Sequence, residues 1–257
     1  MAQIFCITNQ KGGVAKTTTA INLAAGLAQM GKRVLLVDLD PQGNASMGSG
    51  INKFGLERSV YHVLLGWTGA NEVRQATQWG YDVLPSNRDL SGAELELTEV
   101  GDRDARLRLK GALQKVEGQY DYVLIDCPPA LSLLTVNGLA AADGVVIPMQ
   151  CEYFAMEGLA DLVNTIRVVR RNFNEDLQLI GVLRVMFDTR ITLQADVSEQ
   201  LKQHFGDKVF ETIIPRNVRL AEASSFGMPG IVFDKSSRGA EAYVDFSKEM
   251  LIWLDKN

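Results

Sequence analysis

The sequence is poor in the residues that build metal centres and disulfide frameworks. Its 257 residues include three cysteines and two histidines. Cys6, Cys127 and Cys151 lie in or beside apolar runs and lack CxxC spacing, which favours buried, reduced thiols in a cytosolic protein. Neither His62 nor His204 has a metal-ligating partner at a useful spacing. We therefore interpret both histidines as structural or surface residues.

Long apolar runs, a leader peptide and a strong positive charge are also missing. No apolar run approaches the ~20 residues that a membrane span needs. Residues 1–3 lead straight into an apolar run, so we expect no signal peptide. The formal net charge is −5, so any binding of nucleic acid must come from a local basic patch.

Nothing in the chain marks a boundary between domains. The sequence has no low-complexity tract, no internal repeat and no linker rich in proline, serine and glycine. Hydrophobic residues make up 46% and charged residues 22% of the chain, as in ordinary globular proteins. This length suits one large α/β unit, so we expect residues 1–257 to form a single domain.

A glycine-containing loop, residues 9–19, lies between an apolar run at 4–8 and a stretch whose apolar residues have helical spacing. A strand, a glycine turn and a helix that begins at Lys16 form an arrangement that holds a polyphosphate. Backbone N–H groups point at the anion, and the helix dipole adds favourable potential. Lys16 would neutralise phosphate charge, and the Thr17 hydroxyl would complete the coordination shell of Mg²⁺.

The loop departs from the common pattern G-x-x-x-x-G-K-[ST], because Gln10 and Ala15 stand where its two glycines belong. Apart from Ala15 it fits the variant K-G-G-x-G-K-T, with an additional lysine at Lys11. It thus resembles the ParA/MinD family of deviant Walker A P-loop ATPases, and the rest of the chain is most similar to chromosomal, Soj-like ParA proteins. The resemblance implies ATP and Mg²⁺ as cofactors, and a nucleotide site formed by Lys11, Gly12, Gly13, Val14, Ala15, Lys16, Thr17, Thr18, Asp38, Pro215 and Asn217.

Ala15 stands where the variant pattern has glycine. If the backbone needs a positive φ at this position, an alanine costs roughly 1–2 kcal/mol. If φ is negative, only the proximity of the methyl group to the phosphates matters. We expect nucleotide binding to survive in either case.

Two acidic segments follow apolar runs: Asp38-Leu39-Asp40-Pro41-Gln42 after residues 34–37, and Asp126 after residues 122–125. Carboxylates at the carboxyl ends of parallel strands lie where open α/β sheets bind ligands, although either segment alone could be a polar turn. The resemblance implies that Asp38 organises the phosphate end and that Asp40 orients the attacking water. It implies metal ligands at Thr17, Asp40 and Asp126, and catalytic residues at Lys11, Lys16 and Asp40.

The order of the apolar runs predicts the fold class. Strand 4–8, the helix from residue 16 and strand 34–37 form a βαβ unit, so these strands should be parallel. We expect further strands at 81–85, 122–126, 145–149, 179–186 and 211–214, and helices at 61–65, 90–97, 107–116, 159–169 and 240–257. The prediction is an α/β fold with a mostly parallel twisted sheet flanked by helices on both faces, as in P-loop NTPases.

The resemblance also implies an assembly. In the family the additional lysine, here Lys11, reaches across a dimer to the partner's nucleotide, and residues 150–158 contribute to the dimer face. The chain would be a slow ATP hydrolase that forms a homodimer with ATP and binds double-stranded DNA non-specifically. A ParB-type partner would accelerate hydrolysis and release the dimer. We expect a cytoplasmic, nucleoid-associated protein that acts in chromosome or plasmid partitioning.

Arginines gather in part of this acidic chain, with five arginines against three acidic residues in 163–192. Arg190 and Arg219 match positions implicated in DNA binding in the ParA group, although any single arginine could be a solvated surface charge. Lys235 and Arg238 are weaker candidates. The resemblance further implies a base-recognition loop, in which Pro215 packs on the adenine ring and Asn217 hydrogen-bonds its edge.

Other functions stay open from the sequence. A MinD-like ATPase would carry a basic amphipathic membrane anchor at its C-terminus. Residues 240–257 instead mix four acidic residues with two lysines, so we prefer core packing and expect no membrane binding. A cluster-binding redox relative would need a second well-placed cysteine besides Cys127. A ParA-like protein that positions another cargo would have the same ATPase residues.

Overall fold

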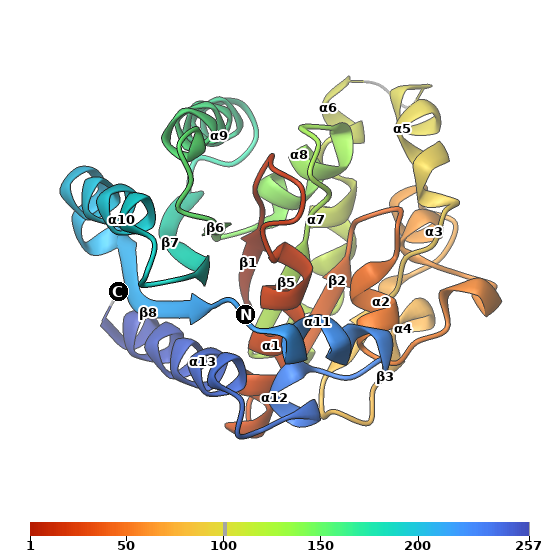
Figure 1. Ribbon diagram of the computed structural model, residues 1–257. Helices are drawn as coiled ribbons and strands as arrows, with labels where there is room; N and C mark the ends of the chain where they lie inside the picture. The colour runs from red at the N-terminus through yellow and green to blue at the C-terminus, as the bar shows by residue number, and fades with distance from the viewer. Residues whose placement is uncertain (100–101, 257) are drawn as a thin grey trace.

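The computed structural model describes residues 1–99 and 102–256. Its centre is one eight-stranded sheet with the order β3-β4-β2-β5-β1-β6-β7-β8 (Figure 1). The strands are β1 (Gln3–Ile7), β2 (Val34–Asp38), β3 (Gln75–Ala76), β4 (Asp82–Leu84), β5 (Tyr122–Asp126), β6 (Gly144–Met149), β7 (Gln178–Phe187) and β8 (Val209–Pro215). Every neighbouring pair is parallel except β3 with β4. The predicted fold class is confirmed.

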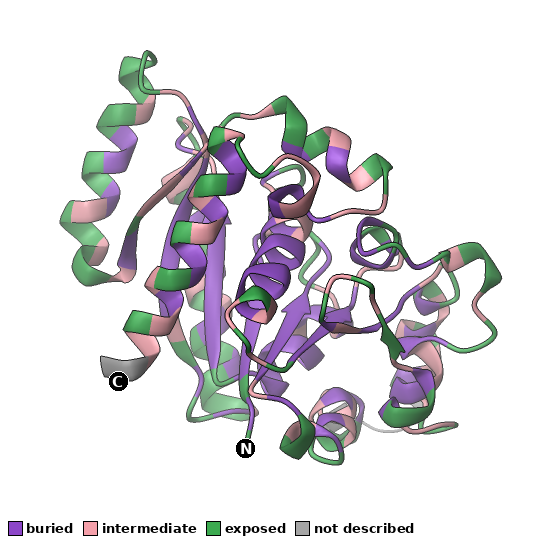
Figure 2. Ribbon diagram, turned by 90° about the horizontal axis from the view of Figure 1, so that it is seen from below, coloured by how far each residue is buried: buried purple, intermediate pink, exposed green. Residues whose placement is uncertain are grey.

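Helices pack on both faces of this sheet (Figures 1 and 2). They are α1 (Lys16–Gln29), α2 (Asn44–Gly48), α3 (Val60–Leu64), α4 (Ala70–Val73), α5 (Leu90–Glu99), α6 (Asp102–Ala105), α7 (Arg108–Leu113), α8 (Leu133–Ala141), α9 (Ala155–Asn172), α10 (Thr192–Phe205), α11 (Val218–Ser225), α12 (Gly230–Phe233) and α13 (Arg238–Lys256). Short 3₁₀ helices are η1 (Lys53–Gly55), η2 (Glu117–Gln119) and η3 (Gly206–Lys208).

The sheet separates two apolar cores, and β1 contributes to both because successive side chains point to opposite faces. Ile4 and Cys6 join the core beneath helices α3, α5, α7, α8, α9 and α10. Phe5 and Ile7 join the core shared with α1, α12 and α13. Figure 2 shows the central strands and α1 almost entirely buried. Burial on both faces is why these strands read as continuous apolar runs in the sequence.

The C-terminal helix α13 belongs to the core, as expected for residues 240–257, of which Asn257 lies outside the described residues. Tyr243, Phe246 and Met250 are buried in the core that α13 shares with α1 and β8. The Glu249 carboxylate accepts hydrogen bonds from two N–H groups of the edge strand β8, at 2.6 and 2.9 Å, and so covers part of an edge that could pair with another chain. Within residues 1–99 and 102–256, no helix is both long and apolar enough to cross a bilayer.

Several elements lie outside the set predicted from the sequence, among them α2, α8, α10 and the antiparallel β3. Helix α8 packs against α7, α9 and β1, so apolar residues surround it and no helical period marks it. The helix expected at 107–116 is shorter and spans Arg108–Leu113. Every predicted strand is present, with ends shifted by at most two residues.

Candidate nucleotide site

The loop between β1 and α1 has the backbone conformation of a phosphate cradle. Gly13 has φ of 73°, and Ala15 has φ of 56° and ψ of 28°. A Cβ atom added at Gly12 or Gly13 would meet no atom within 4 Å. The space above the loop is therefore open to a ligand that approaches the backbone closely.

Ala15 occupies the left-handed region, so the backbone at this position does need a positive φ. Its carbonyl accepts the Thr19 N–H at 2.8 Å, which starts helix α1. The left-handed conformation explains why glycine suits this position, because a side chain there costs roughly 1–2 kcal/mol.

Replacing Ala15 by glycine should raise the free energy of unfolding by about 0.5–1 kcal/mol. Glycine removes the left-handed strain, but it loses part of that gain because its unfolded chain has more conformational freedom. Ala15→Val is the matched control, because a β-branched residue is more strained at positive φ and should lower stability. Denaturant unfolding of the three proteins tests this; equal stability of the alanine and valine forms would contradict it.

Lys16 lies at the start of α1 with only 7% of its surface exposed. Its ammonium donates to the Lys11 carbonyl at 3.0 Å. Burial lowers the pKa of this ammonium, while the charges of Asp126 and Asp40 act in the opposite direction. A partly desolvated cation at a helix N-terminus is well placed to receive an anion.

Thr17 and Asp126 meet at the carboxyl edge of the sheet. The Thr17 hydroxyl donates to Asp126 Oδ2 at 2.7 Å, whereas the buried Oδ1 has no hydrogen-bond partner. Burial raises the pKa of Asp126 well above its usual range, and the neighbouring Asp38 raises it further. An orphaned carboxylate oxygen beside a hydroxyl fits Mg²⁺, a hard cation that takes oxygen ligands. No cluster of three or more His, Cys, Asp or Glu ligands occurs among the described residues, so phosphate and water oxygens would have to complete the shell.

Asp38 is buried, and its carboxylate is hydrogen-bonded to other groups of the same chain. Its carboxylate accepts from the Ser46 N–H and hydroxyl, both at 2.7 Å, and from the Asp40 N–H at 3.3 Å. Burial raises the pKa of Asp38 to about 6. These contacts hold the first turn of α2 and the segment that carries Asp40.

Asp40 is half-buried at the turn that follows β2. Its Oδ1 accepts the Gln42 N–H at 2.9 Å, and its carbonyl accepts the Ser86 hydroxyl at 2.9 Å. The turn is therefore held from two sides.

The segment expected to bind the base follows β8. Pro215 ends the strand, and the Asn217 side chain caps α11 by accepting the Arg219 N–H at 2.8 Å. Helix α12 is tied to α1, because the Ile231 N–H donates to Asn22 Oδ1 at 2.9 Å. This contact brings the region after β8 alongside the helix that starts at the phosphate loop (Figure 1).

The two arginines expected to contact DNA lie near this segment, and each is ion-paired within the chain. Arg190 makes two hydrogen bonds to the Asp188 carboxylate, at 2.9 and 2.6 Å. Arg219 pairs with Glu222 at 2.8 Å and with Asp234 at 3.2 Å. Arg190 and Arg219 therefore have separate carboxylate partners.

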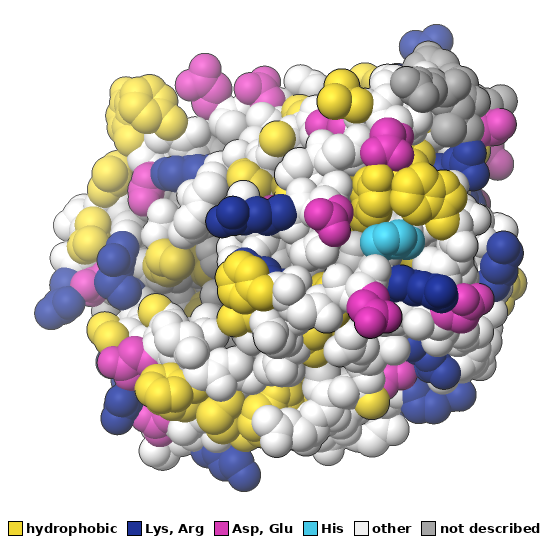
Figure 3. Space-filling model, turned by 90° about the vertical axis from the view of Figure 1, so that its right-hand side faces the viewer, with side chains coloured by type: hydrophobic (Ala, Val, Ile, Leu, Met, Phe, Trp, Pro, Cys, Tyr) yellow, Lys and Arg dark blue, Asp and Glu magenta, His cyan; other side chains and the backbone are white. Residues whose placement is uncertain are grey.

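Arg190 shares a hollow of about 830 Å³ with Arg216 and Arg238. Sequence analysis missed Arg216, although it lies between the predicted residues Pro215 and Asn217. Asp188, Glu241 and Asp245 line the same hollow, so its three arginines are accompanied by three carboxylates. Charges are also mixed on the face at the right of Figure 1, where acidic and basic side chains alternate with apolar ones (Figure 3).

Lys11 has a partner that sequence analysis also missed. Its ammonium forms an ion pair with Glu152, in the segment between β6 and α9. Tyr153 and Phe154 follow, with 74% and 72% of their surface exposed and their rings in edge-to-face contact. No local pattern links positions 11 and 152, because 141 residues separate them.

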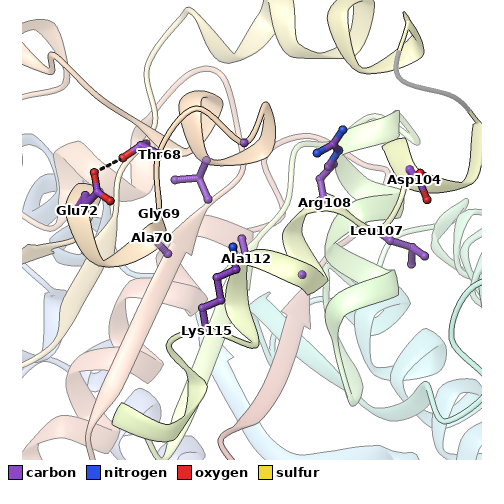
Figure 4. Close-up of a pocket in the computed structure, with 12 residues that line it drawn as sticks. Thr68, Gly69, Ala70, Glu72, Asp104, Leu107, Arg108, Ala112 and Lys115 are labelled. Carbon is purple, nitrogen blue, oxygen red and sulfur yellow. Dashed lines mark hydrogen bonds between the residues drawn. The ribbon is translucent and has the colours of Figure 1, made fainter.

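A second hollow, of about 770 Å³, lies between the α3–α4 connection and α7. Figure 4 shows Arg108 and Lys115 along one wall and the hydrogen-bonded pair Thr68 and Glu72 on the other. None of the predicted site residues lines it. It is therefore separate from the phosphate loop.

Comparison with known proteins identifies the family. A family model described as an AAA domain matches residues 2–179. The chain is 53% identical to the sporulation initiation inhibitor protein Soj of Bacillus subtilis, over 97% of this chain and 98% of that protein. It is 47% identical to the chromosome partitioning protein ParA of Caulobacter vibrioides, over 97% and 94% of the two chains. The chain belongs to the ParA/Soj family. This agrees with the resemblance found in the sequence.

A solved structure supports the assignment of the fold. A cobyrinic acid a,c-diamide synthase from Mycobacterium smegmatis, solved with ADP and magnesium, superposes with a TM-score of 0.85. It is 39% identical, over 98% of this chain and 94% of that one. The overall fold is thus shared with a protein that was solved with a bound nucleotide.

Proposed function

We propose that this protein is a ParA-type partitioning ATPase, with residues 1–257 acting as one domain that binds ATP and Mg²⁺. The observation that carries the proposal is the pairing of Thr17 with Asp126, which leaves one buried carboxylate oxygen unpartnered beside the phosphate loop. The family relationship supports ATP hydrolysis as the reaction.

Each residue of the loop has a distinct task in this proposal. Lys16 neutralises phosphate charge, and the positive φ at Gly13 and Ala15 shapes the loop. Thr17 and Asp126 hold Mg²⁺, which when bound offsets the charge of the phosphates. Asp40 orients the attacking water from a turn that Ser86 and Gln42 hold in place.

We propose an ATP-dependent homodimer in which Lys11 reaches the partner's nucleotide. The exposed pair Tyr153 and Phe154 supports a protein contact close to Lys11, because exposed aromatic side chains are enriched at interfaces. Dimerisation would bring two copies of the Arg190 and Arg219 surface together. When two weakly binding patches are joined in one dimer, binding of the first patch raises the effective concentration of the second at the DNA, and the overall affinity rises.

Non-specific DNA binding would place the dimer on the nucleoid, and a ParB-type partner would release it by accelerating a slow hydrolysis. The supporting observation is that Arg190, Arg216 and Arg238 line one hollow together with Pro215, two residues before Asn217. Nucleotide and DNA contacts on one segment allow the bound nucleotide to control DNA binding.

The test is binding to arbitrary duplex DNA with ATP and with ADP, at two salt concentrations. We expect binding with ATP only, falling steeply with salt because phosphate contacts release counterions. Arg190→Gln and Arg219→Gln should each weaken DNA binding by about 3- to 10-fold while sparing ATP-dependent dimerisation, since each removes a phosphate contact.

Arg171→Gln is the matched control, because Arg171 is an exposed arginine on α9 away from this segment. Loss of dimerisation in the Arg219 variant would show that nucleotide and DNA roles are not separate. Pelleting with anionic vesicles, combined with no DNA binding, would favour a MinD-like function instead.

A further inference from the structure

The ion pair between Lys11 and Glu152 lies within one chain. It joins the loop after β1 to the segment between β6 and α9, and the two side chains are 51% and 47% exposed. Solvent and a partner molecule can therefore reach both groups. In the described structure, the lysine assigned to the partner's nucleotide is directed at its own chain.

Two further contacts hold the backbone at this point. The Lys11 N–H donates to Asn9 Oδ1 at 3.0 Å, and Asn9 Nδ2 donates to the Pro148 carbonyl at 2.8 Å. The Lys11 carbonyl accepts from the Lys16 ammonium at 3.0 Å. The loop is thus fastened to β6 through Asn9, and only the Lys11 side chain has to swing away to reach a partner.

We propose that Glu152 is a positioning residue that holds Lys11 in the unassembled chain and opposes dimerisation until ATP is bound. The inference rests on the proposed function, since it requires Lys11 to contact the partner's nucleotide. A carboxylate with one negative charge competes with the larger negative charge of a bound triphosphate. Lys11 leaves Glu152 when a partner presents its nucleotide, and returns when the nucleotide charge falls on hydrolysis.

Replacing Glu152 by glutamine should strengthen dimerisation, because glutamine keeps the size of the side chain and removes its charge. We expect the dimer dissociation constant with a non-hydrolysable ATP analogue to fall roughly 3- to 10-fold, since one exposed ion pair no longer has to break in each protomer. Sedimentation equilibrium over a range of protein concentrations measures it.

The matched control is Glu157→Gln in the first turn of α9, five residues further along the chain, where an exposed glutamate has no ion-pair partner among the described residues. Its dissociation constant should not change. Glu152→Asp keeps the negative charge and should dimerise as the parent does, whereas a purely structural role of the longer side chain would be lost in this variant.

An unchanged or weaker dimer in Glu152→Gln would overturn the inference, because Glu152 would then be neutral or would support the assembled state. The same measurement on the unmodified protein distinguishes this result from a failure of the proposed function. If that protein stays monomeric with the ATP analogue, the ATP-dependent dimer is wrong, and the inference falls with it.

Discussion

Lys16→Ala should weaken ATP binding by about 100-fold or more. Lys16 is 7% exposed, and its ammonium donates to a backbone carbonyl, that of Lys11. Removing a buried charge partner of a phosphate costs about 3–5 kcal/mol, and every 1.4 kcal/mol is tenfold in affinity. Hydrolysis and ATP-dependent DNA binding should be lost with it.

A titration with a fluorescent ATP analogue measures this effect. The matched control is Lys11→Ala on the same loop, which should bind the nucleotide with nearly unchanged affinity but fail to dimerise. Without nucleotide, Lys16→Ala should unfold at about the same denaturant concentration as the parent. The substitution loses the hydrogen bond to the Lys11 carbonyl but also removes a charge that burial disfavours in the folded chain, as the lowered pKa of the ammonium indicates. Unchanged ATP affinity in the Lys16 variant would mean that the nucleotide binds elsewhere.

Asp40→Ala should slow ATP hydrolysis by about 100- to 10,000-fold, the usual contribution of a positioned acid or base. Binding and dimerisation should persist, because Lys16, Thr17 and Asp126 remain in place. The dimer should therefore accumulate on DNA. Steady-state phosphate release, together with the half-life of the DNA complex, measures both parts of the prediction.

The variant Asp40→Asn distinguishes the effect of the carboxylate charge from the effect of the local turn. An asparagine side-chain oxygen can still accept the Gln42 N–H that Asp40 Oδ1 accepts at 2.9 Å, so the turn should survive. We expect the asparagine variant to hydrolyse ATP as slowly as the alanine variant. Near-normal hydrolysis by Asp40→Asn would show that the turn, rather than the carboxylate charge, is what the reaction needs.

The sequence predicted the strands well and the helices unevenly. Strands β2 and β5 are buried on both faces, so each appears as an apolar run that ends at an aspartate. The same burial hid α8, whose apolar residues face neighbours on several sides. Helix α10 did carry a signal in the sequence, because its buried residues Val197 and Leu201 are four positions apart.

For the candidate site, residue identities were predictable but their contacts were not. The lysines, the threonine and the aspartates follow from the loop pattern and from where the apolar runs end. The partner of Lys11 does not, because Glu152 is 141 positions away and lies on a different connection. Similarly, the sequence does not show that Arg190 pairs with Asp188 or that Arg219 pairs with Asp234.

By itself, then, the sequence determined the phosphate loop, the succession of strands and acidic segments along the chain, and the ParA/Soj resemblance. Each of these depends on residues that are close together in the chain. Only the tertiary structure decided the sign of φ at Ala15, the unpartnered oxygen of Asp126 and the retention of Lys11 by Glu152. The physical reason for the last two contacts is the order of the strands within the sheet. Because β1 lies between β5 and β6, Asp126 comes close to Thr17 and the segment with Glu152 comes close to Lys11.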